Sequence, residues 1–392
     1  MVQEKLVSSE KTKNDNNVYH DEPELRFPEF NDSWKRIKIH EITDSITKGT
    51  TPKNYSEEGI NFIKVENIEN NQIININSYI DVNTHKNELS RSILEKNDLL
   101  FSIAGTLGRT AKVTEDILPA NTNQALAILK INDLNAINVD YVQTRLNCSD
   151  IEKYIFQNLA VGAQPNLNLK QVGDIEIKLP SKSEQDKIQN FINSINKKIE
   201  LLEKKLVLCR KTIDSNLRKI YSDLEEYDEI KLKDIVKSYA SNLSINKLEE
   251  NIGEYPLYGA EGIIKYVDFY EMKSPYISII KDGAGVGRLN LCNEFSSALG
   301  TLQCLIPKQD ININFLYFYL KTLNFYKYIV GSTIPHIYFK DYSKERIKVP
   351  SLRRQQDIGN YFSLCEKKNN LIKEEIEVLN KFKQGLLQKM FF

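Results

Sequence analysis

The sequence lacks the features of several large classes of protein. Its five cysteines are scattered without a Cys-x-x-Cys pair, which disfavours a disulfide framework or a cysteine-based zinc site and predicts free thiols in a reducing cytoplasm. No uninterrupted apolar run approaches the roughly 18 residues that span a bilayer. The polar N-terminus also lacks the apolar core of a secretory signal. We therefore expect a cytoplasmic protein without membrane contact.

An excess of charge of either sign is also missing. Lysine plus arginine and aspartate plus glutamate number 53 each, so the formal net charge is zero. This balance excludes a generally basic, histone-like chain, but it is compatible with a basic face on one side of a domain.

Motifs for common enzyme chemistry are missing as well. The sequence has no GxxxxGK[ST] loop for ATP and no NPPY or DPPY run for methylation of base amino groups. The four histidines show no metal-ligand spacing. Residues 282–288 (DGAGVGR) lack the GxGxxG spacing, and we interpret them as a hairpin turn whose glycines adopt positive φ. We expect no catalytic residue and no metal in this chain.

The composition that is present is that of an ordinary globular protein. The 392 residues are 41% apolar and 27% charged. At roughly 150 residues per domain, they suffice for about two or three domains. Residues 1–22 are polar and turn-rich, and we predict a flexible tail there.

The chain contains an internal repeat. Four short segments recur in the same order, at offsets that fall from 193 to 170 residues. Four ordered matches indicate one module used twice, with extra loop residues in the first copy. The matched segments are 38–42 with 231–235, 105–109 with 284–288, 137–141 with 311–315, and 174–180 with 344–350.

Each copy ends in a long helical pattern. Apolar residues follow a heptad rhythm after Pro180 and again after Pro350, and the two rhythms superpose at an offset of 170 residues. A period of 3.5 favours a partner helix, and at about 1.5 Å per residue the stretch 188–220 would form a rod of about 50 Å. We predict that the two helices pair with each other as an antiparallel coiled coil; a coiled coil between chains is the alternative. The predicted pairing residues are Ile188, Ile192, Ile195, Ile199, Leu202, Leu206, Ile358, Phe362, Asn369, Ile372, Ile376 and Leu379.

The globular parts carry mixed α and β patterns. Short apolar runs predict strands at residues 60–65, 98–103 and 278–280. Helices are predicted at 141–158 and 315–330, and we place the aromatic stripe of the second in the core rather than in a base-stacking surface. The predicted fold is α+β, with two tandem-duplicated mixed α/β domains separated by two long helices. The predicted boundaries are the tail at 1–22, a first domain at 23–182, a central helical spacer at 183–224, a second domain at 225–352 and a C-terminal helical spacer at 353–392.

One segment weakly resembles a nuclease site. Glu176 and Lys178 have the spacing of an ExK motif, and Asp174 lies just before them. The repeat places Arg346 opposite Glu176, so the acid has no counterpart, and we favour a strand edge. The nuclease hypothesis predicts metal-dependent nicking by the isolated chain that Glu176→Ala abolishes.

The start of each module resembles a known type of domain. Residues 23–30 (PELRFPEF) with Trp34 resemble the usual start of a first target-recognition domain in the specificity subunit of type I restriction–modification systems. Residues 49–53 (GTTPK) with Tyr55 resemble one subclass of that domain, and residues 255–263 (YPLYGAEGI) resemble another.

The start of each helical spacer supports the same resemblance. Residues 180–185 and 350–355 are similar to the Pro-x-x-x-Glu-Gln motif of that family, although Arg354 replaces the glutamate in the second copy. The resemblance covers roughly residues 23–392, and the order and duplication of its motifs make it specific.

This resemblance implies a division of labour. Such subunits use two recognition domains to read the two halves of an asymmetric, bipartite DNA site, and their paired helices set the unread gap. Two modification subunits, which are adenine N6-methyltransferases, dock on the pseudo-twofold scaffold, and restriction subunits add ATP-dependent translocation and cleavage. The resemblance implies no cofactor in this chain, because S-adenosylmethionine, ATP and Mg are bound by the partners. A duplicated chain suits two identical partners, since it has approximate twofold symmetry.

DNA contacts are expected from polar and basic side chains on loops. The residues expected to bind DNA are Lys48, Thr50, Thr51, Lys53, Tyr55, Arg109, Gln164 and Asn166 in the first copy, and Tyr258, Lys281, Arg288, Ser332, His336 and Lys340 in the second. The pI of about 6.9 departs from the basic signature of a stand-alone DNA binder. We therefore expect weak DNA binding by the isolated chain and salt-sensitive binding by the assembled complex.

One further alternative is a non-catalytic coiled-coil adaptor with two ligand-binding heads, lectin-like or peptide-binding. It keeps the two helices but predicts no methylation partner.

Overall fold

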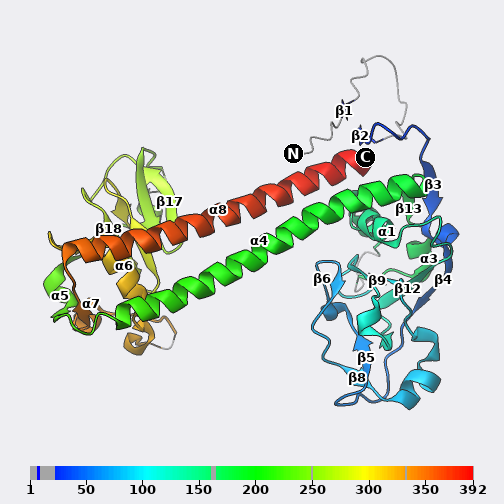
Figure 1. Ribbon diagram of the computed structural model, residues 1–392, viewed down its shortest axis with the longest axis horizontal. Coiled ribbons are helices and arrows are strands. Elements are labelled where there is room, and N and C mark those ends of the chain that lie inside the picture. The colour runs from blue at the N-terminus through cyan, green and yellow to red at the C-terminus, as the bar shows by residue number, and fades with distance from the viewer. Residues whose placement is uncertain (1–6, 9–22, 160–164, 249, 332, 392) are drawn as a thin grey trace. The chain divides into compact units, whose positions relative to one another are not determined.

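The computed structural model describes residues 7–8, 23–159, 165–248, 250–331 and 333–391. They divide into two compact units: unit 1 comprises Met1–Glu200 and Glu377–Phe392, and unit 2 comprises Leu201–Ile376. Each unit contains one globular module and parts of two long helices, α4 (Lys182–Ser222) and α8 (Leu352–Phe391) (Figure 1). Most of the predicted tail lies outside the described residues.

The module of unit 1 is built around a four-stranded antiparallel sheet in the order β10-β9-β12-β4. A three-stranded sheet, β11-β5-β8, contains a parallel pair, β11 with β5. All four residues of β9 (LLFS) are buried, which explains its uninterrupted apolar run. The strands of unit 1 are β1 (Val7–Ser8), β2 (Leu25–Arg26), β3 (Lys35–Lys38), β4 (Thr43–Lys48), β5 (Ile60–Ile63), β6 (Ile68–Glu69), β7 (Gln72–Ile73), β8 (Tyr79–Ile80), β9 (Leu99–Ser102), β10 (Thr110–Lys112), β11 (Ala120–Thr122), β12 (Leu126–Ile131) and β13 (Glu176–Leu179).

The module of unit 2 repeats the topology of these two sheets. Its antiparallel sheet has the order β19-β18-β21-β15, and its second sheet contains the parallel pair β20 with β16. The strands of unit 2 are β14 (Glu229–Lys231), β15 (Val236–Ala240), β16 (Tyr255–Gly259), β17 (Gly262–Val267), β18 (Tyr276–Ile280), β19 (Leu289–Cys292), β20 (Ser297–Ala298), β21 (Leu302–Pro307) and β22 (Arg346–Lys348). The duplication seen in the sequence is therefore a duplication of the fold.

Each module is closed by a strand pair formed from its two ends. Strand β3 pairs with β13 in unit 1, and β14 pairs with β22 in unit 2, both antiparallel. The residue that ends each of these modules, Pro180 or Pro350, lies two positions before the first residue of the long helix that follows.

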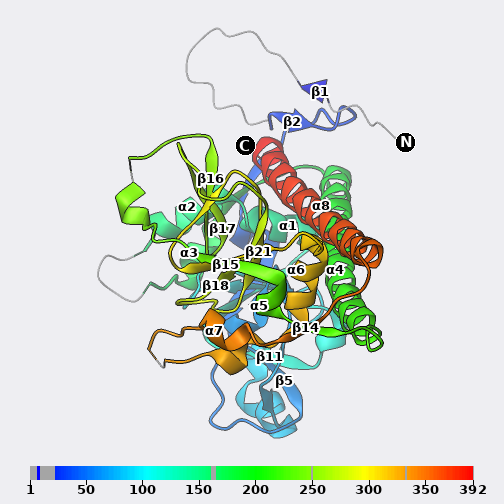
Figure 2. The ribbon, with the colours of Figure 1, turned by 90° about the vertical axis from the view of Figure 1, so that its left-hand side faces the viewer.

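Short helices cover the sheets. They are α1 (Val139–Leu146), α2 (Ser149–Gln157) and α3 (Leu169–Gly173) in unit 1, and α5 (Leu232–Ile235), α6 (Ile313–Thr322) and α7 (Phe339–Tyr342) in unit 2. Helix α6 lies beside the sheet that contains β18 (Figure 2). Its residues Phe315 and Phe318 belong to one buried cluster with Ile277 and Leu305 of that sheet. The aromatic stripe is thus mostly core, as predicted, although Tyr326 is 77% exposed.

Both predicted module helices are shorter than expected, because each is interrupted. The predicted helix 141–158 divides into α1 and α2, where Asn147 ends the first and Cys148 precedes the second. The predicted helix 315–330 ends after Thr322, and the side chain of Asn324 accepts the Tyr326 N–H at 3.0 Å to begin a separate 3₁₀ turn.

The long helices pair in antiparallel fashion within each unit. Ile188 near the start of α4 shares a buried cluster with Met390 near the end of α8. Tyr221 near the end of α4 stacks on Phe362 near the start of α8, with ring centroids 6.2 Å apart. The predicted α+β fold with two duplicated modules and two long helices is confirmed.

The predicted pairing residues are buried, except Leu206, Ile376 and Leu379, which are half-buried. Asn369 takes the position that Ile199 has in the first copy. Its Oδ1 has no hydrogen-bond partner among the described residues. No helix in the described part of the chain has both the length and the apolar character required to cross a bilayer.

Candidate functional site

In unit 1, several loops meet at one edge of the four-stranded sheet. Lys48 at the end of β4 lies opposite Ala127 of β12, and Ser102 at the end of β9 lies opposite Leu126. The loops after β4 and β9 therefore leave the sheet at the edge where β12 begins. The N–H of Thr50 donates to the Thr122 carbonyl at 3.1 Å, which ties the first of these loops to the segment before β12.

Unit 2 gathers the corresponding loops. Ala240 at the end of β15 lies opposite Gln303 of β21, and Ile280 at the end of β18 lies opposite Leu302. Most residues expected to bind DNA lie on these loop clusters, which we call edge 1 (residues 48–55, 103–109 and 165–167) and edge 2 (residues 281–288, 330–331 and 333–337).

On edge 1, the side chains after β4 are available to a ligand. Lys48, Thr50 and Lys53 are exposed. The hydroxyl of Thr51 donates to the side-chain oxygen of Gln124. Tyr55 is 48% exposed, and the Lys64 ammonium lies 4.7 Å from the centroid of its ring. This loop therefore combines hydroxyl, ammonium and aromatic groups.

In the remaining segments of edge 1, residues 103–109 and 165–167, some groups make contacts within the protein. Arg109 is exposed, but its Nη1 donates to the Ile68 carbonyl at 2.9 Å, and the residue lines a cavity of about 390 Å³. Asn166 is exposed and forms an antiparallel bridge with Ala104. Gln164, expected to contact DNA, lies outside the described residues.

On edge 2, the glycine-rich segment forms the predicted hairpin turn. Gly283, Gly285 and Gly287 have φ values of 88°, 83° and 85°. A Cβ on Gly285 would lie 3.1 Å from a terminal nitrogen of Arg288, so the guanidinium packs over this glycine. Arg288 is nevertheless exposed, and Lys281 is half-buried.

The remaining residues of the second copy differ in their placement. His336 is half-buried, and its Nδ1 lies 2.7 Å from Oδ1 of Asp282. Lys340 is exposed on α7. Tyr258 is 5% exposed and its hydroxyl accepts the Asn293 N–H at 3.2 Å, so its placement in the core does not favour a DNA contact. Ser332 lies outside the described residues.

The glutamine of the Pro-x-x-x-Glu-Gln motif joins each long helix to its module. In unit 1, Oε1 of Gln185 accepts the Asn138 N–H at 2.8 Å, and its Nε2 donates to the Pro180 carbonyl at 2.9 Å. In unit 2, Gln355 makes the same bonds at 2.8 Å and 2.9 Å with the duplicated residues. Both glutamines are 1% exposed. These contacts explain why glutamine occupies this position in both copies, because its buried amide finds hydrogen-bond partners for both its donor and its acceptor groups.

The preceding motif position explains why the second copy departs from the pattern. Glu184 is 1% exposed and accepts from Nε and Nη2 of Arg26 at 2.7 and 2.8 Å, which fastens the segment before β3 to α4. Arg354, at the same position of the second copy, is exposed at the start of α8. A carboxylate at this motif position is therefore required only in unit 1, where Arg26 lies opposite it.

The segment that weakly resembles a nuclease site is a strand with a cross-strand ion pair. Glu176 accepts from Nη1 of Arg36 at 3.2 Å, across β13 and β3. The duplicated pair has the opposite polarity: Arg346 on β22 lies 3.8 Å from Glu229 on β14. No group of three or more metal-ligating side chains is found among the described residues.

The buried cysteines are not poised for nucleophilic chemistry. Burial raises the pKa of Cys148 and of Cys292 to about 11, and it raises the pKa of Cys304 further. These thiols therefore stay protonated near neutral pH.

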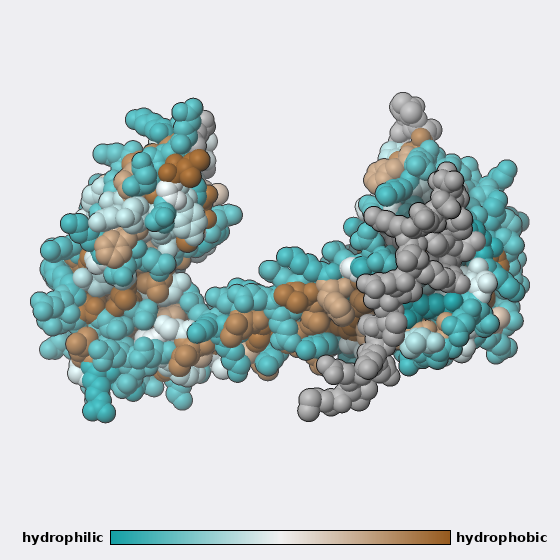
Figure 3. All heavy atoms as spheres, turned by 90° about the horizontal axis from the view of Figure 1, so that it is seen from above, coloured by the Kyte–Doolittle hydropathy of each residue, from teal (hydrophilic) through white to brown (hydrophobic). Residues whose placement is uncertain are grey.

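The long helices carry a second apolar set that does not face the pairing seam. Leu201 and Leu208 of α4 are 57% and 65% exposed, and Leu371 and Val378 of α8 are 56% and 64% exposed. The members of each pair, Leu201 with Leu371 and Leu208 with Val378, are related by the 170-residue offset. Apolar side chains are visible at the surface of the helices in Figure 3. Exposed apolar residues thus recur at equivalent positions of the two helices, and we call the two pairs candidate docking surfaces.

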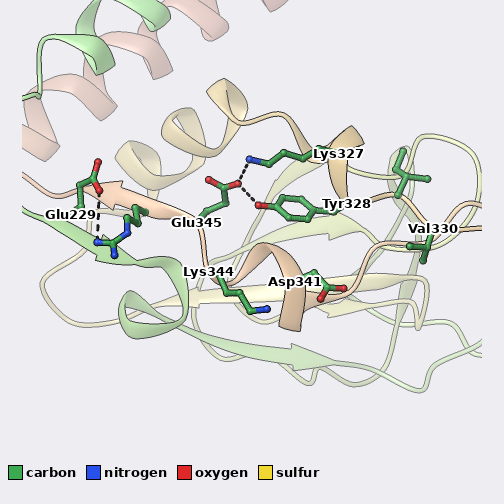
Figure 4. Close-up of a pocket in the computed structure, with 9 residues that line it drawn as sticks. Glu229, Lys327, Tyr328, Val330, Asp341, Lys344 and Glu345 are labelled. Atoms are coloured by element: carbon green, nitrogen blue, oxygen red, sulfur yellow. Dashed lines mark hydrogen bonds and ion pairs between the residues drawn. The ribbon is translucent and has the colours of Figure 1, made fainter.

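A charged pocket in unit 2 lies beside the segment that leads into edge 2, and residues that line the pocket hold this segment in place. It has a volume of about 720 Å³ and lies between the 3₁₀ turn Phe325–Tyr328 and β22 (Figure 4). The Glu345 carboxylate accepts from the Tyr328 hydroxyl and pairs with the Lys327 ammonium. Burial raises the pKa of Glu345, but these two hydrogen bonds outweigh it and keep that pKa below its usual value. The network fixes the turn that leads into residues 330–337.

Both modules match one known protein family. The family model for the type I restriction modification DNA specificity domain matches residues 31–208 and again residues 224–381. A candidate type I specificity subunit of Mycoplasma pneumoniae is 27% identical over 288 residues, which cover 69% of this chain and 77% of that protein. The EcoBI type I restriction enzyme specificity subunit of Escherichia coli is 29% identical over 156 residues, which cover 38% of this chain and 31% of that protein.

Solved structures show the same fold. The S subunit of a type I restriction–modification system from M. genitalium superposes with a TM-score of 0.66 at 21% identity, over 95% of this chain and 99% of that one. A chain from a structural study of complex assembly in a type I system superposes with a TM-score of 0.55 at 16% identity, over 91% and 97% of the two chains.

Proposed function

This chain belongs to the family of type I restriction–modification DNA specificity subunits, and from that premise we propose that it selects the DNA sequence on which such a complex acts. Unit 1 reads one half of a bipartite site through edge 1, and unit 2 reads the other half through edge 2. The chain performs no chemistry itself. S-adenosylmethionine, ATP and Mg are bound by its partner subunits.

The observation that carries this proposal is the pair of modules with one topology and different loops. Both place the loops after two equivalent strands at the edge where β12 or β21 begins. The loop residues differ between the copies, so the two modules should prefer different bases. An asymmetric target follows, because two unlike readers on one chain cannot produce a palindrome. The long helices would set the spacing between the half-sites, which on DNA is counted in turns of about 34–36 Å.

The docking surfaces support a complex with two modification subunits. Two apolar positions on α4 recur on α8 with nearly equal exposure. A duplicated surface of this kind suits two copies of one partner. Restriction subunits would join this core and add cleavage.

The proposal is tested in a methylation-free host that carries this chain with the modification subunit encoded beside it, against the modification subunit alone. Single-molecule sequencing should detect N6-methyladenine in a new bipartite, asymmetric motif only when this chain is present. Exchange of residues 27–180 or 227–350 between relatives should alter one arm each. If the proteins neither co-purify nor produce a motif, the proposal fails and the coiled-coil adaptor becomes the better interpretation.

A further inference from the structure

The two edges share one backbone frame. In unit 1, the Leu167 N–H donates to the Ile103 carbonyl at 2.9 Å, and Asn166 bridges to Ala104. In unit 2, the Ile337 N–H donates to the Lys281 carbonyl at 2.9 Å, and the next pair along the same bridge is His336 with Asp282. Two loops far apart in each module are thus joined at the same point in both copies.

The side chains at this shared point differ. The pair is alanine with asparagine in unit 1 and aspartate with histidine in unit 2. Two related modules that recognise different DNA sequences require the same backbone frame with different polar side chains on it. This position is therefore distinguished from the neighbouring glycines, which serve the turn in both copies.

From this difference, and on the basis of the proposed function, we propose that His336 contacts a base edge in the half-site of unit 2 and that Asp282 is its positioning residue. Asn166 is the counterpart in unit 1. Asp282 acts through His336 and does not touch the DNA.

The contact between His336 and Asp282 determines which hydrogen-bonding atom His336 offers to a base. Nδ1 of His336 lies 2.7 Å from Oδ1 of Asp282, and both side chains are about one third exposed. A neutral imidazole that donates through Nδ1 carries its lone pair on Nε2. The acceptor Nε2 suits the amino group of cytosine or adenine in the major groove, and an asparagine amide suits the N6 and N7 edge of adenine.

The frame around His336 is rigid, as a reading group requires. Val330 and His336 exchange two backbone hydrogen bonds, at 2.9 and 2.8 Å, and the Gly283 N–H donates to the Pro335 carbonyl at 3.0 Å. The start of the segment is held by the contacts of Glu345 with Tyr328 and Lys327 (Figure 4).

The test is selection from a pool of random-sequence duplexes by the assembled complex of this chain with its modification subunits. We compare the wild type with His336→Asn, Asp282→Ala and Asn166→His. His40→Asn is the matched control, because this exposed histidine in unit 1 also binds through Nδ1, at 2.9 Å from the Gly173 carbonyl, but lies outside both edges.

We expect His336→Asn to change the base preference at one position of one arm by about tenfold, since one base-edge contact carries discrimination of that order. Asp282→Ala should broaden the same position and no other. Asn166→His should change one position of the other arm, and the control should change neither.

Unchanged preferences in His336→Asn and Asn166→His would overturn the inference. So would a loss of affinity that is uniform over both arms, since that is the result of a phosphate contact or a structural brace. If the wild-type complex enriches no sequence, the proposed function itself fails, which separates the two outcomes. Asn166→His still tests the position if the His336 variant does not fold.

Discussion

The ring of Phe391, at the end of α8, packs against Tyr141 of α1 with centroids 5.6 Å apart. The duplicated pair, Tyr221 at the end of α4 and Phe315 of α6, has centroids 5.5 Å apart. Within unit 1, therefore, the end of the chain fills the place that the middle of the chain fills in unit 2. Phe391 is 1% exposed and shares its buried cluster with Trp34.

We predict that Phe391→Ala lowers the free energy of unfolding of unit 1 by about 3–5 kcal/mol, the usual cost of removing a buried phenylalanine. Urea unfolding measures this change. Phe382→Ala is the matched control, since Phe382 lies on the same helix but is 49% exposed. Equal effects of the two substitutions would contradict the role of Phe391 as a core residue.

The ion pair at the start of α4 should matter in only one copy. Glu184→Ala leaves the largely buried guanidinium of Arg26 without its carboxylate, and such a loss costs about 3–5 kcal/mol. Arg354→Ala, at the duplicated position, should change stability by less than about 0.5 kcal/mol because that side chain is exposed. Thermal unfolding of the two variants checks the contrast, and a comparable loss in both would refute it.

The reversed polarity of the strand-end ion pairs predicts an effect on pairing between modules. In the wild type, the opposite arrangement of charges in the two modules disfavours mispairing of a strand of one module with a strand of the other. If β3 of unit 1 paired with β22 of unit 2, Arg36 would lie near Arg346 and the two like charges would repel. Reversing unit 1 alone with Arg36→Glu and Glu176→Arg keeps its own pair but removes that repulsion. We expect more dimers or larger species after refolding, as measured by light scattering on a sizing column.

The matched control for this prediction reverses both modules, adding Glu229→Arg and Arg346→Glu. The repulsion against exchange is then restored, and the fraction of monomer should return to that of the wild type. Each exposed pair contributes less than about 1 kcal/mol, so a change of a few-fold in that fraction is expected. An unchanged fraction in the unit 1 variant would argue against this effect of the charges.

The two docking surfaces predict a stepwise loss of partners. Leu201→Glu with Leu208→Glu should leave the fold intact, because both side chains are more than half exposed, but should weaken one modification-subunit site. Adding Leu371→Glu and Val378→Glu should weaken the second. Native mass spectrometry of the complex should report two, one and no modification subunits. Retention of both in the fourfold variant would show that the subunits bind elsewhere.

Buried Asp98 predicts a pH dependence of stability. Burial raises its pKa to about 6, although the Glu95 N–H and the charge of Lys130 act in the opposite direction. Between about pH 4 and pH 6 the folded state holds more protons on this group than the unfolded state does. Its contribution to stability therefore falls as pH rises through this window, by at most about 3 kcal/mol, and is constant above it.

Asp98→Asn should remove this dependence. The amide oxygen can still accept the Glu95 N–H, which now binds the carboxylate at 2.8 Å. The variant should gain stability relative to the wild type between pH 4 and pH 6, and the difference should be flat above pH 7. Asp133→Asn, at an exposed aspartate that also accepts a backbone N–H, should show no such rise. Parallel pH profiles of Asp98→Asn and the wild type would exclude Asp98 as the source.

The sequence by itself determined the duplication, the two long helices and their pairing seam. A heptad period is local and regular, so it survives in any context that offers a partner helix. The positive φ of the glycines in 282–288 could also be predicted, since a tight hairpin excludes most side chains. The family followed from motifs in a fixed order.

Only the tertiary structure decided which of these residues meet. The breaks after Leu146 and after Thr322 fall inside stretches whose apolar pattern predicts a single continuous helix. Tyr258 is in the core and His336 is joined to Asp282 because strands and loops far apart in the chain come together there. A side chain's burial and partners are set by such distant contacts, and no periodic pattern along the chain encodes them.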